Sequence, residues 1–157
     1  MPDDRAFEEL WRAEFASVTW TAYLIVGGWD DATDIAQEAF TRTYQHWGRV
    51  ARYERPSAMV HRIATNLALS ATRKARPALP VEGRVVPPPE VPDPALTEAM
   101  RRLTPAQRAV ITLRFYLDWS VDDVAKALHK RPGTVTALTH QGMERLRSEL
   151  VKERLDE

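Results

Sequence analysis

The chain has 157 residues, with 22 basic and 22 acidic side chains, four histidines and no cysteine. This length fits one ordinary domain or two small ones, and a hydrophobic content of 44% is enough to form real cores. The lack of cysteine excludes disulfides, Cys-ligated zinc and thiol chemistry. The acidic amino terminus lacks the apolar run of a signal peptide, and no apolar stretch is long enough to span a bilayer, so we expect a cytoplasmic protein.

The net charge of zero hides an uneven distribution of charge along the chain. Residues 1–54 hold ten acidic and five basic side chains, whereas residues 55–76 hold five basic side chains and no acidic one. Residues 101–157 are again basic, with eleven basic against eight acidic side chains. This asymmetry predicts different partners for different segments, and the basic segments are suited to a polyanion such as DNA.

Hydrophobic residues at helical spacing predict three helices in the first part of the chain, over residues 5–26, 31–47 and 56–74. Asp30 and Asp31 are suitable residues to cap the second helix. No run of residues is typical of a strand, so we expect an all-α fold.

The second predicted helix carries a narrow polar stripe. At about 100° per residue, Asp34, Gln37 and Glu38 fall on one side of it. The opposite side is apolar and can be buried, and nothing beside the stripe resembles a catalytic group. Two interpretations of these residues alone remain open, a docking surface for a protein partner and an ordinary solvated face.

The third predicted helix has a basic face. Arg62, Asn66 and Arg73 gather nearly opposite its apolar side, and His61 flanks them. Basic side chains attract phosphates, and asparagine can hydrogen-bond a base edge, so this face is a candidate for DNA binding. The alternative is that the arginines are ordinary surface charges.

Three aromatic residues lie close to this helix in the sequence, namely Tyr44, Trp47 and Tyr53. Aromatic rings can stack on unpaired bases, and they can equally be part of a hydrophobic core. Because aromatic side chains are mostly buried, the core interpretation is the more common one.

A proline-rich segment follows. Seven of the 11 prolines lie in residues 77–94, where they prevent a helix and favour extended polyproline conformation. The sequence therefore predicts a semi-rigid linker over residues 76–95 between two small helical domains, residues 1–75 and 96–157.

The second domain begins with Thr104 and Gln107, which have the spacing of a capping box. The core candidates that follow are Val110, Ile111, Leu113 and Phe115. Ser120 opens a short helix to about residue 128, and a longer helix is predicted over residues 132–154. A short helix, a tight turn and a longer helix are the layout of a helix-turn-helix, although a generic helical hairpin has the same periodicity.

A helix-turn-helix normally places the start of its second helix in the DNA major groove. The side chains in position to contact DNA are Lys130, Arg131, Thr134, Thr136, His140 and Gln141. Lys130 and Arg131 would lie near the phosphates, and the others near the base edges. Each of these residues could instead be plain surface.

The ordered set of motifs resembles the extracytoplasmic-function (ECF) sigma factors, the small initiation subunits of bacterial RNA polymerase. Residues 34–40, Asp-Ile-Ala-Gln-Glu-Ala-Phe, resemble the family motif Asp-Leu-Val-Gln-Glu-x-Phe. Residues 55–58 and 62–68 resemble the helix that engages the −10 promoter element. Residues 103–110 resemble the start of the carboxy-terminal domain, and residues 133–135 resemble the opening of its −35 recognition helix.

The resemblance implies roles for single residues. The positions that contact the polymerase clamp correspond to Asp34, Gln37 and Glu38. The positions that bind the −10 element correspond to Arg62, Asn66 and Arg73, to which we add the neighbouring Arg55 and His61. The partners implied are core RNA polymerase, promoter DNA and an anti-sigma factor, without a cofactor, a metal or a small-molecule substrate.

The chain also departs from the family pattern. Met59 stands where the family usually has tryptophan, and His129 replaces a common turn glycine. Uncharged residues occupy positions where Lys or Arg is frequent in the recognition helix, namely Thr136, Leu138, Gln141 and Met143. We therefore expect weaker or unusual recognition of the −35 element.

Two other functions stay open. A sigma-like mimic would bind an anti-sigma protein without engaging promoters, and an ordinary helix-turn-helix repressor would bind DNA without polymerase. An enzyme is not expected, because the four histidines are dispersed and form no recognisable group with acidic residues.

Overall fold

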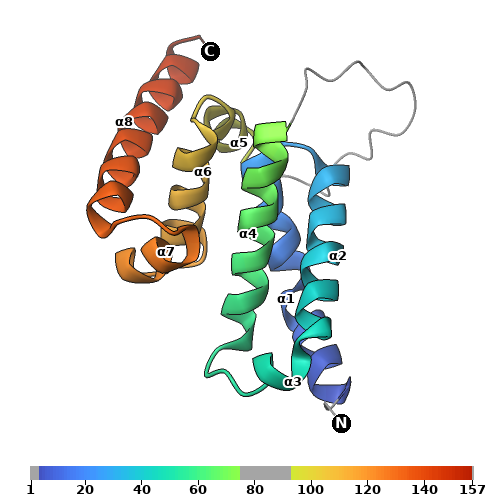
Figure 1. Ribbon diagram of the computed structural model, residues 1–157. Helices are drawn as coiled ribbons and strands as arrows, with labels where there is room; N and C mark the ends of the chain where they lie inside the picture. The colour runs from blue at the N-terminus through green and yellow to red at the C-terminus, as the bar shows by residue number, and fades with distance from the viewer. Residues whose placement is uncertain (1–3, 75–92, 157) are drawn as a thin grey trace. The chain divides into compact units, whose positions relative to one another are not determined.

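The computed structural model describes residues 4–74 and 93–156, which form helices joined by short turns (Figure 1). The chain divides into two compact units, Met1–Val86 and Pro87–Glu157. The described residues contain no strand, which confirms the predicted all-α fold. Within these ranges, no helix has the length and apolar character needed to cross a membrane.

Three long helices that pack against one another build the first unit: α1 (Asp4–Val26), α2 (Trp29–Gln45) and α4 (Pro56–Lys74). Their bounds lie within two residues of the predicted ones. Gly27 ends α1 in the left-handed region, with φ of 82°, and its amide donates to the Tyr23 carbonyl at 2.8 Å. Glycine adopts this conformation at little steric cost, so α1 stops here and α2 can turn back beside it.

The core of the first unit lies where the three helices meet. Its buried members are Val18, Ala36, Ala39, Phe40, Val60 and Ala64. The small alanines of α2 allow close approach of its neighbours, while Phe40 fills the space between them. Three rings of α1 surround Phe40, with centroids 4.8–6.2 Å from it, and they belong to Phe7, Trp11 and Phe15. This packing fixes which face of α2 is left to the solvent.

The amino terminus of α2 differs from the prediction. Its N-cap is Gly28, in an extended conformation and without a side-chain capping hydrogen bond. Asp30 and Asp31, which were predicted as caps, lie instead in the first helical turn. There their carboxylates still stabilise the positive end of the helix dipole. The prediction of a helix was therefore right, but its first residue was placed too late in the sequence.

A short helix that was not predicted, α3 (Trp47–Val50), follows α2. Trp47 and Val50 are buried, and the Trp47 ring lies 5.4 Å from the ring of Phe7 on α1. The segment before α4 is therefore anchored to the core by Trp47 and Val50, while residues 51–55, including Tyr53, are exposed.

The second unit is built around the longest helix, α8, which packs against α5, α6 and α7. The elements are α5 (Pro94–Arg101), α6 (Pro105–Ile111), the π-helical turn η1 (Thr112–Tyr116), α7 (Val121–Leu128) and α8 (Pro132–Asp156). The α7–α8 pair confirms the predicted helix-turn-helix layout. Buried residues from all parts of the unit include Leu103, Val110, Leu113, Val124, Val135 and Leu146.

Two predicted caps are present in the second unit. The Gln107 amide donates to Thr104 Oγ1 at 3.2 Å, and the Thr104 amide donates to Gln107 Oε1 at 3.1 Å, which completes a capping box. The Asp123 amide donates to Ser120 Oγ at 3.1 Å at the start of α7. These contacts join residues only three apart, so the sequence alone was enough to predict them.

The prediction that Phe115 belongs to the core is wrong, because the helix changes type. In η1 the Leu117 amide donates to the Thr112 carbonyl, five residues back, at 3.2 Å. The extra residue in this turn shifts the register of the side chains. As a result Phe115 is 55% exposed, and the Arg114 guanidinium lies 5.8 Å from the centre of its ring.

Helix α5 was also not predicted. Asp93 caps it by accepting from the Leu96 amide, and Pro94 occupies the first turn. The helix therefore begins inside the predicted linker, residues 76–95, of which residues 76–92 lie outside the described part of the chain. In the sequence, Pro94 was counted with the helix-breaking prolines before it, although proline is favoured in a first helical turn.

The turn between α7 and α8 has an unusual backbone at His129, where φ is 54°. The Lys130 amide donates to the Ala125 carbonyl at 2.9 Å, and this hydrogen bond closes the end of α7. Helices commonly end in this way at a left-handed residue, which is usually glycine. A histidine thus occupies a left-handed position in the tight turn that orients α8.

Candidate functional site

The polar stripe on α2 is exposed over its whole length. Asp34, Gln37 and Glu38 are solvent-accessible, while the buried residues of α2 lie on the other side of the helix. Glu38 Oε1 accepts from Arg42 Nε at 2.9 Å, and both side chains are 50% exposed. The predicted geometry of the stripe is confirmed, and one of its carboxylates carries an exposed ion-pair partner.

The basic face of α4 is only partly as predicted. Arg73 is exposed in the last turn, Arg62 and Asn66 are half-buried, and Arg55 is exposed just before the helix. Asn66 Nδ2 donates to the Arg62 carbonyl at 3.0 Å, which holds the amide close to the helix backbone. Because α4 has no acidic residue, this face remains positive along its length.

His61 does not belong to this face. Its side chain is 5% exposed. Its Nε2 lies 3.1 Å from Glu14 Oε2, and its Nδ1 lies 3.3 Å from Thr21 Oγ1, both on α1. Helix α4 packs against both α1 and α2, so its buried arc is wider than a single apolar stripe and includes His61. The burial of His61 removes it from the candidate DNA-binding residues.

The three aromatic residues near α4 have different environments. Trp47 is 3% exposed and belongs to the core, as the more common interpretation predicted. Tyr44 is 48% exposed and donates its hydroxyl to Asp4 Oδ1 at 3.0 Å. Tyr53, which is 38% exposed, lies between Arg52 and Arg55 in the sequence.

The start of α8 presents an uncharged exposed surface. Thr134, Thr136, His140 and Gln141 are all exposed, as is Arg131, whereas Lys130 is half-buried. The Thr136 hydroxyl donates to the Pro132 carbonyl at 3.1 Å, and His140 Nε2 lies 3.3 Å from Glu144 Oε1. The structure thus places the predicted residues at one end of α8 but on two sides of it, Thr136 and His140 beside η1 and Gln141 beside α6. It also adds an acidic neighbour, Glu144.

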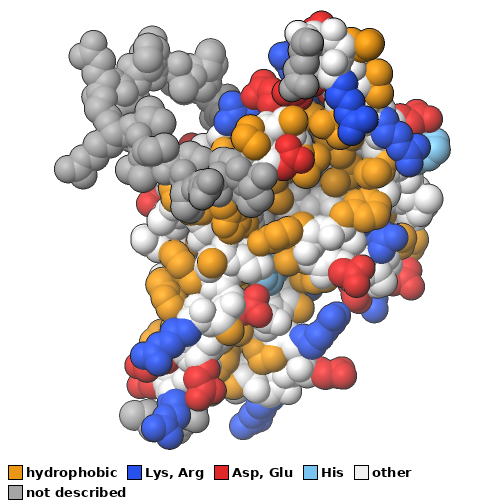
Figure 2. Space-filling model, turned by 180° about the vertical axis from the view of Figure 1, so that it is seen from behind, with side chains coloured by type: hydrophobic (Ala, Val, Ile, Leu, Met, Phe, Trp, Pro, Cys, Tyr) orange, Lys and Arg blue, Asp and Glu red, His pale blue; other side chains and the backbone are white. Residues whose placement is uncertain are grey.

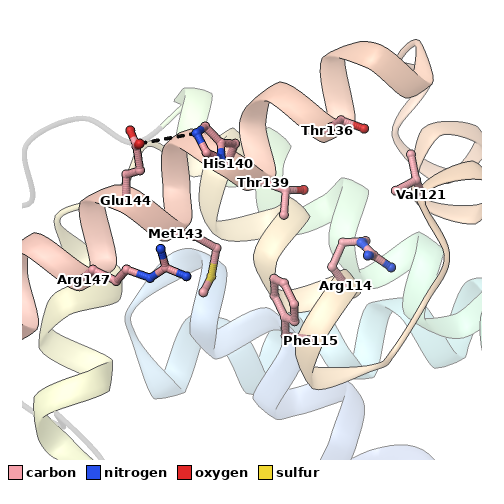
Figure 3. A pocket seen from close by; sticks show the side chains of 9 residues that line it. All are labelled: Arg114, Phe115, Val121, Thr136, Thr139, His140, Met143, Glu144 and Arg147. Atoms are coloured by element: carbon pink, nitrogen blue, oxygen red, sulfur yellow. Dashed lines mark ion pairs between the residues drawn. The ribbon is translucent and has the colours of Figure 1, made fainter.

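One flank of this surface borders a shallow cavity of about 430 Å³ (Figure 3). Thr136, His140, Met143 and Arg147 line it from α8, opposite Arg114 and Phe115 of η1. The two arginines were not selected from the sequence. The helical spacing of Thr136, His140 and Arg147 would have identified Arg147, whereas the position of Arg114 depends on the π-helical turn.

Charged side chains of both signs are mixed on the surface. On the face shown in Figure 2, basic and acidic side chains lie near one another, with hydrophobic side chains reaching the surface between them. Large exposed apolar residues among those described include Phe115, Tyr116, Val151 and Leu155. The segregation of charge is seen along single helices, since α2 carries the acidic stripe and α4 has no acidic residue.

Comparison with protein families covers both units. Residues 10–77 match the family model for Sigma-70 region 2, and residues 94–146 match that for Sigma-70, region 4. Thus α2 and α4 lie within the region 2 match. The region 4 match covers α7 and the first part of α8, up to residue 146.

Known proteins are similar over nearly the whole chain. The RNA polymerase sigma-E factor of Streptomyces antibioticus is 32% identical over 96% of this chain and 87% of its own length. The ECF RNA polymerase sigma factor SigW of Bacillus subtilis is 28% identical over 82% of this chain and 80% of its own length. A solved structure of the sigma factor RpoE with the anti-sigma factor NepR, from Bartonella quintana, shares the fold with a TM-score of 0.75 at 18% identity, covering 94% of this chain and 98% of that one. Both units, in order and over this coverage, place the chain in the ECF sigma factors, which direct RNA polymerase to promoters.

Proposed function

We propose that three helices of this sigma factor divide the recognition of polymerase and promoter between them. In this proposal α2 docks on core RNA polymerase, α4 holds the −10 element, and α8 reads the −35 element. The observation that supports it best is the contrast within the first unit, where an exposed acidic stripe and an acid-free basic face lie on neighbouring packed helices.

The proposed polymerase contact consists of Asp34, Gln37 and Glu38. Carboxylates and an amide on one rigid helix can be paired with basic groups of a partner, and electrostatic complementarity favours both specificity and fast association. The opposite face of α2 forms the core, so this stripe is positioned by the packing of Ala36, Ala39 and Phe40. A rigid position of this kind suits a docking surface better than a loop does.

Charge reversal tests this contact. We expect Glu38→Lys to weaken binding to core polymerase by about tenfold or more. The lysine would carry the same charge as the basic groups that the stripe is proposed to face, and would repel them. The helical content should be retained, since Glu38 is 50% exposed and its ion pair with Arg42 contributes only about 0.3–0.5 kcal/mol. Binding is measured by biolayer interferometry with immobilised core polymerase, and folding by circular dichroism.

Two controls separate position from net charge. Glu9→Lys makes the same change in charge at an exposed residue of α1 outside the stripe, so it should bind nearly as the parent does. The double variant Glu38→Arg with Arg42→Glu keeps the ion pair and the net charge but moves the carboxylate, and it should bind weakly. Equal binding by all variants would exclude Glu38 from the contact, and an unfolded Glu38→Lys would assign it a structural role.

The proposed −10 contact consists of Arg55, Arg62, Asn66 and Arg73, together with the exposed ring of Tyr53. The positive side chains would hold the phosphates of the separated strand, and Tyr53 would stack on an unpaired base. Capturing a base in this way offsets an unstacking cost of a few kcal/mol.

The proposed −35 contact contains few charged side chains, because the exposed residues at the start of α8 are threonine, histidine and glutamine. Sequence selection would then come mainly from hydrogen bonds to base edges, of which Gln141 can make two to adenine. We expect Gln141→Ala to reduce discrimination at one −35 position by about 1–3 kcal/mol while leaving binding to core polymerase unchanged. Transcription from a library of −35 variants measures this, and unchanged selectivity would exclude a reading role for Gln141.

A second candidate function is a mimic that sequesters an anti-sigma protein, and the uncharged recognition surface favours it. The relative from Bartonella quintana was solved with an anti-sigma factor, and we propose an anti-sigma partner for this chain as well. In vitro transcription with core polymerase and a promoter library distinguishes the two functions. Core binding without a promoter-specific transcript would support the mimic, whereas promoter-specific transcripts support the sigma factor.

We also propose that the chain acts in the cytoplasm as a regulatory subunit and is not itself an enzyme. The polymerase supplies the chemistry, and the chain supplies recognition. An ordinary repressor would leave the first unit without a role, although that unit matches region 2 and carries the acidic stripe.

A further inference from the structure

A cluster of three polar side chains joins α1 to α4 in the first unit. His61 of α4 lies against Glu14 and Thr21, which are two turns apart on α1. The His61 side chain is 5% exposed, whereas the Glu14 side chain is 28% exposed. The cluster therefore extends from the core toward the surface, and the proposed polymerase and promoter contacts do not use it.

The hydrogen bonds of the neutral ring are set by its neighbours. An ionised carboxylate only accepts, so the 3.1 Å contact with Glu14 requires the hydrogen on His61 Nε2. Nδ1 is then an acceptor at 3.3 Å from Thr21 Oγ1. To donate to it, the Thr21 hydroxyl turns from the Ser17 carbonyl, its acceptor at 2.9 Å. In this state every ring nitrogen has a partner on α1.

The protonated ring also finds partners, because the Thr21 hydroxyl can turn. Protonation makes Nδ1 a donor, and Thr21 Oγ1 becomes its acceptor. The Thr21 hydroxyl hydrogen can then point to the Ser17 carbonyl, which is 2.9 Å away. His61 can thus be protonated while both ring nitrogens keep a hydrogen-bond partner. The free-energy cost of protonation comes from placing a positive charge in the core.

Glu14 is the one ionisable group, among the described residues, that acts on the imidazole. The buried residues of α2, which also packs against α4, are Ala32, Ala36, Ala39, Phe40 and Thr43, and none of them is ionisable. On α4 itself the neighbouring ionisable residue in the sequence is Arg62, which is half-buried. Burial lowers the pKa of His61 below 6.5, and Glu14 opposes this effect only in part.

We propose that His61, Glu14 and Thr21 form a pH-sensitive clamp that holds α4 to α1 firmly at neutral pH and weakens as the pH falls. The unfolded chain binds a proton at His61 more readily than the folded chain does, so acid favours unfolding. The stabilisation is fully present above about pH 6.5, the ordinary pKa of histidine, and is lost as the pH falls toward the lower pKa of the folded protein. This inference does not depend on the roles proposed for α2, α4 and α8.

The first test measures stability at two pH values on the full chain. Four of the five tryptophans, Trp11, Trp20, Trp29 and Trp47, belong to the first unit, so tryptophan fluorescence follows mainly its unfolding by urea. The His61→Gln variant keeps a side chain that can donate to Glu14 but cannot titrate. We expect the folding equilibrium constant of the parent to fall between pH 7.5 and 5.5 by more than that of the variant. Each unit of pKa displacement corresponds to about a tenfold difference.

A matched control uses His46, which is exposed just after α2 in the same unit. His46→Gln should keep the full acid sensitivity of the parent. If His61→Gln and the parent lose stability equally on acidification, or if His46→Gln abolishes the difference, the clamp is excluded.

The second test observes the histidine directly and remains decisive if His61→Gln fails to fold. Titration of the assigned His61 Cε1 proton by NMR should give a pKa below 6.5. In Glu14→Gln the pKa should fall further, because the carboxylate that partly favours the charged ring has been removed. A His61 pKa at or above 6.5, or one that Glu14→Gln leaves unchanged, would overturn the proposal.

Discussion

At the scale of the residue, the backbone of His129 is strained in the turn of the helix-turn-helix. Its φ of 54° places a residue with a Cβ in the left-handed region, which costs about 1–2 kcal/mol relative to the right-handed one. The same turn ends α7 and sets the direction of α8. The orientation of the recognition surface is therefore held by the packing around this turn and not by local preference.

Replacing this residue with glycine should stabilise the second unit. We expect His129→Gly to raise its unfolding free energy by about 0.5–1 kcal/mol, because relief of the left-handed strain exceeds the entropy that glycine gains in the unfolded chain. Hydrogen exchange of α7 and α8 peptides, followed by mass spectrometry, should slow by about two- to fivefold. His140→Gly, in the regular part of α8, is the control and should speed exchange instead.

At the scale of the element, α8 is positioned by a close approach to α6. Gly142 is the buried residue at this contact, and a Cβ placed there would collide with Ile111 Cδ1. Ile111 is itself 6% exposed, so its side chain has little room to turn away. The distance between the two helices is therefore set by the absence of a side chain at position 142.

The close approach makes a normally favourable substitution unfavourable. Glycine to alanine inside an exposed helix gains about 1 kcal/mol, but overpacking a core costs about 1–3 kcal/mol, so Gly142→Ala should destabilise the second unit by up to about 2 kcal/mol. Gly133→Ala, where nothing lies within 4 Å of the added Cβ, is the matched control and should be neutral or stabilising. Hydrogen exchange of α6 and α8 peptides measures the change in stability of both variants. If Gly142→Ala stabilises the unit, the Ile111 side chain can move to make room for the added Cβ.

Several features set by near neighbours in the sequence were predicted, although the Asp93 cap of α5 was not. Features set by distant neighbours were not predicted. The caps at Thr104 and Ser120 join residues three apart, and the helix bounds of the first unit follow from local signals. The burial of His61 depends on Glu14, 47 residues earlier, so no spacing within α4 indicates it. The exposure of Phe115 follows from the local π-helical turn η1, which hydrophobic spacing does not indicate.

The candidate site shows the same division. The stripe of Asp34, Gln37 and Glu38 lies on one helix, and its exposure follows from helical periodicity alone. The pairing of His140 with Glu144 is also local, at a spacing of four residues, and was open to prediction. Arg114 reaches the flank of α8 through the tertiary packing of η1, which the sequence pattern does not reveal.

At the scale of the whole molecule, the uneven charge matters more than the net charge of zero. The acidic residues of the first 54 positions suit a basic protein surface, and the acid-free α4 that follows suits DNA. An acidic face turned to DNA would repel it, so the charge pattern also prevents α2 from taking the place of α4. The two surfaces can then act together only if their partners meet the molecule from different sides.

This division predicts how salt affects promoter binding by the holoenzyme. A side chain that neutralises one phosphate of a separated strand releases counterions, so Arg73→Ala should reduce the slope of log affinity against log salt concentration by about 0.7. Gln141→Ala removes a neutral, exposed side chain and should leave the slope unchanged while altering −35 preference. Fluorescence anisotropy of labelled promoter DNA with holoenzyme at several salt concentrations measures both slopes. If Arg73→Ala lowers affinity by the same factor at every salt concentration, the arginine acts through the fold of α4 and not through a phosphate.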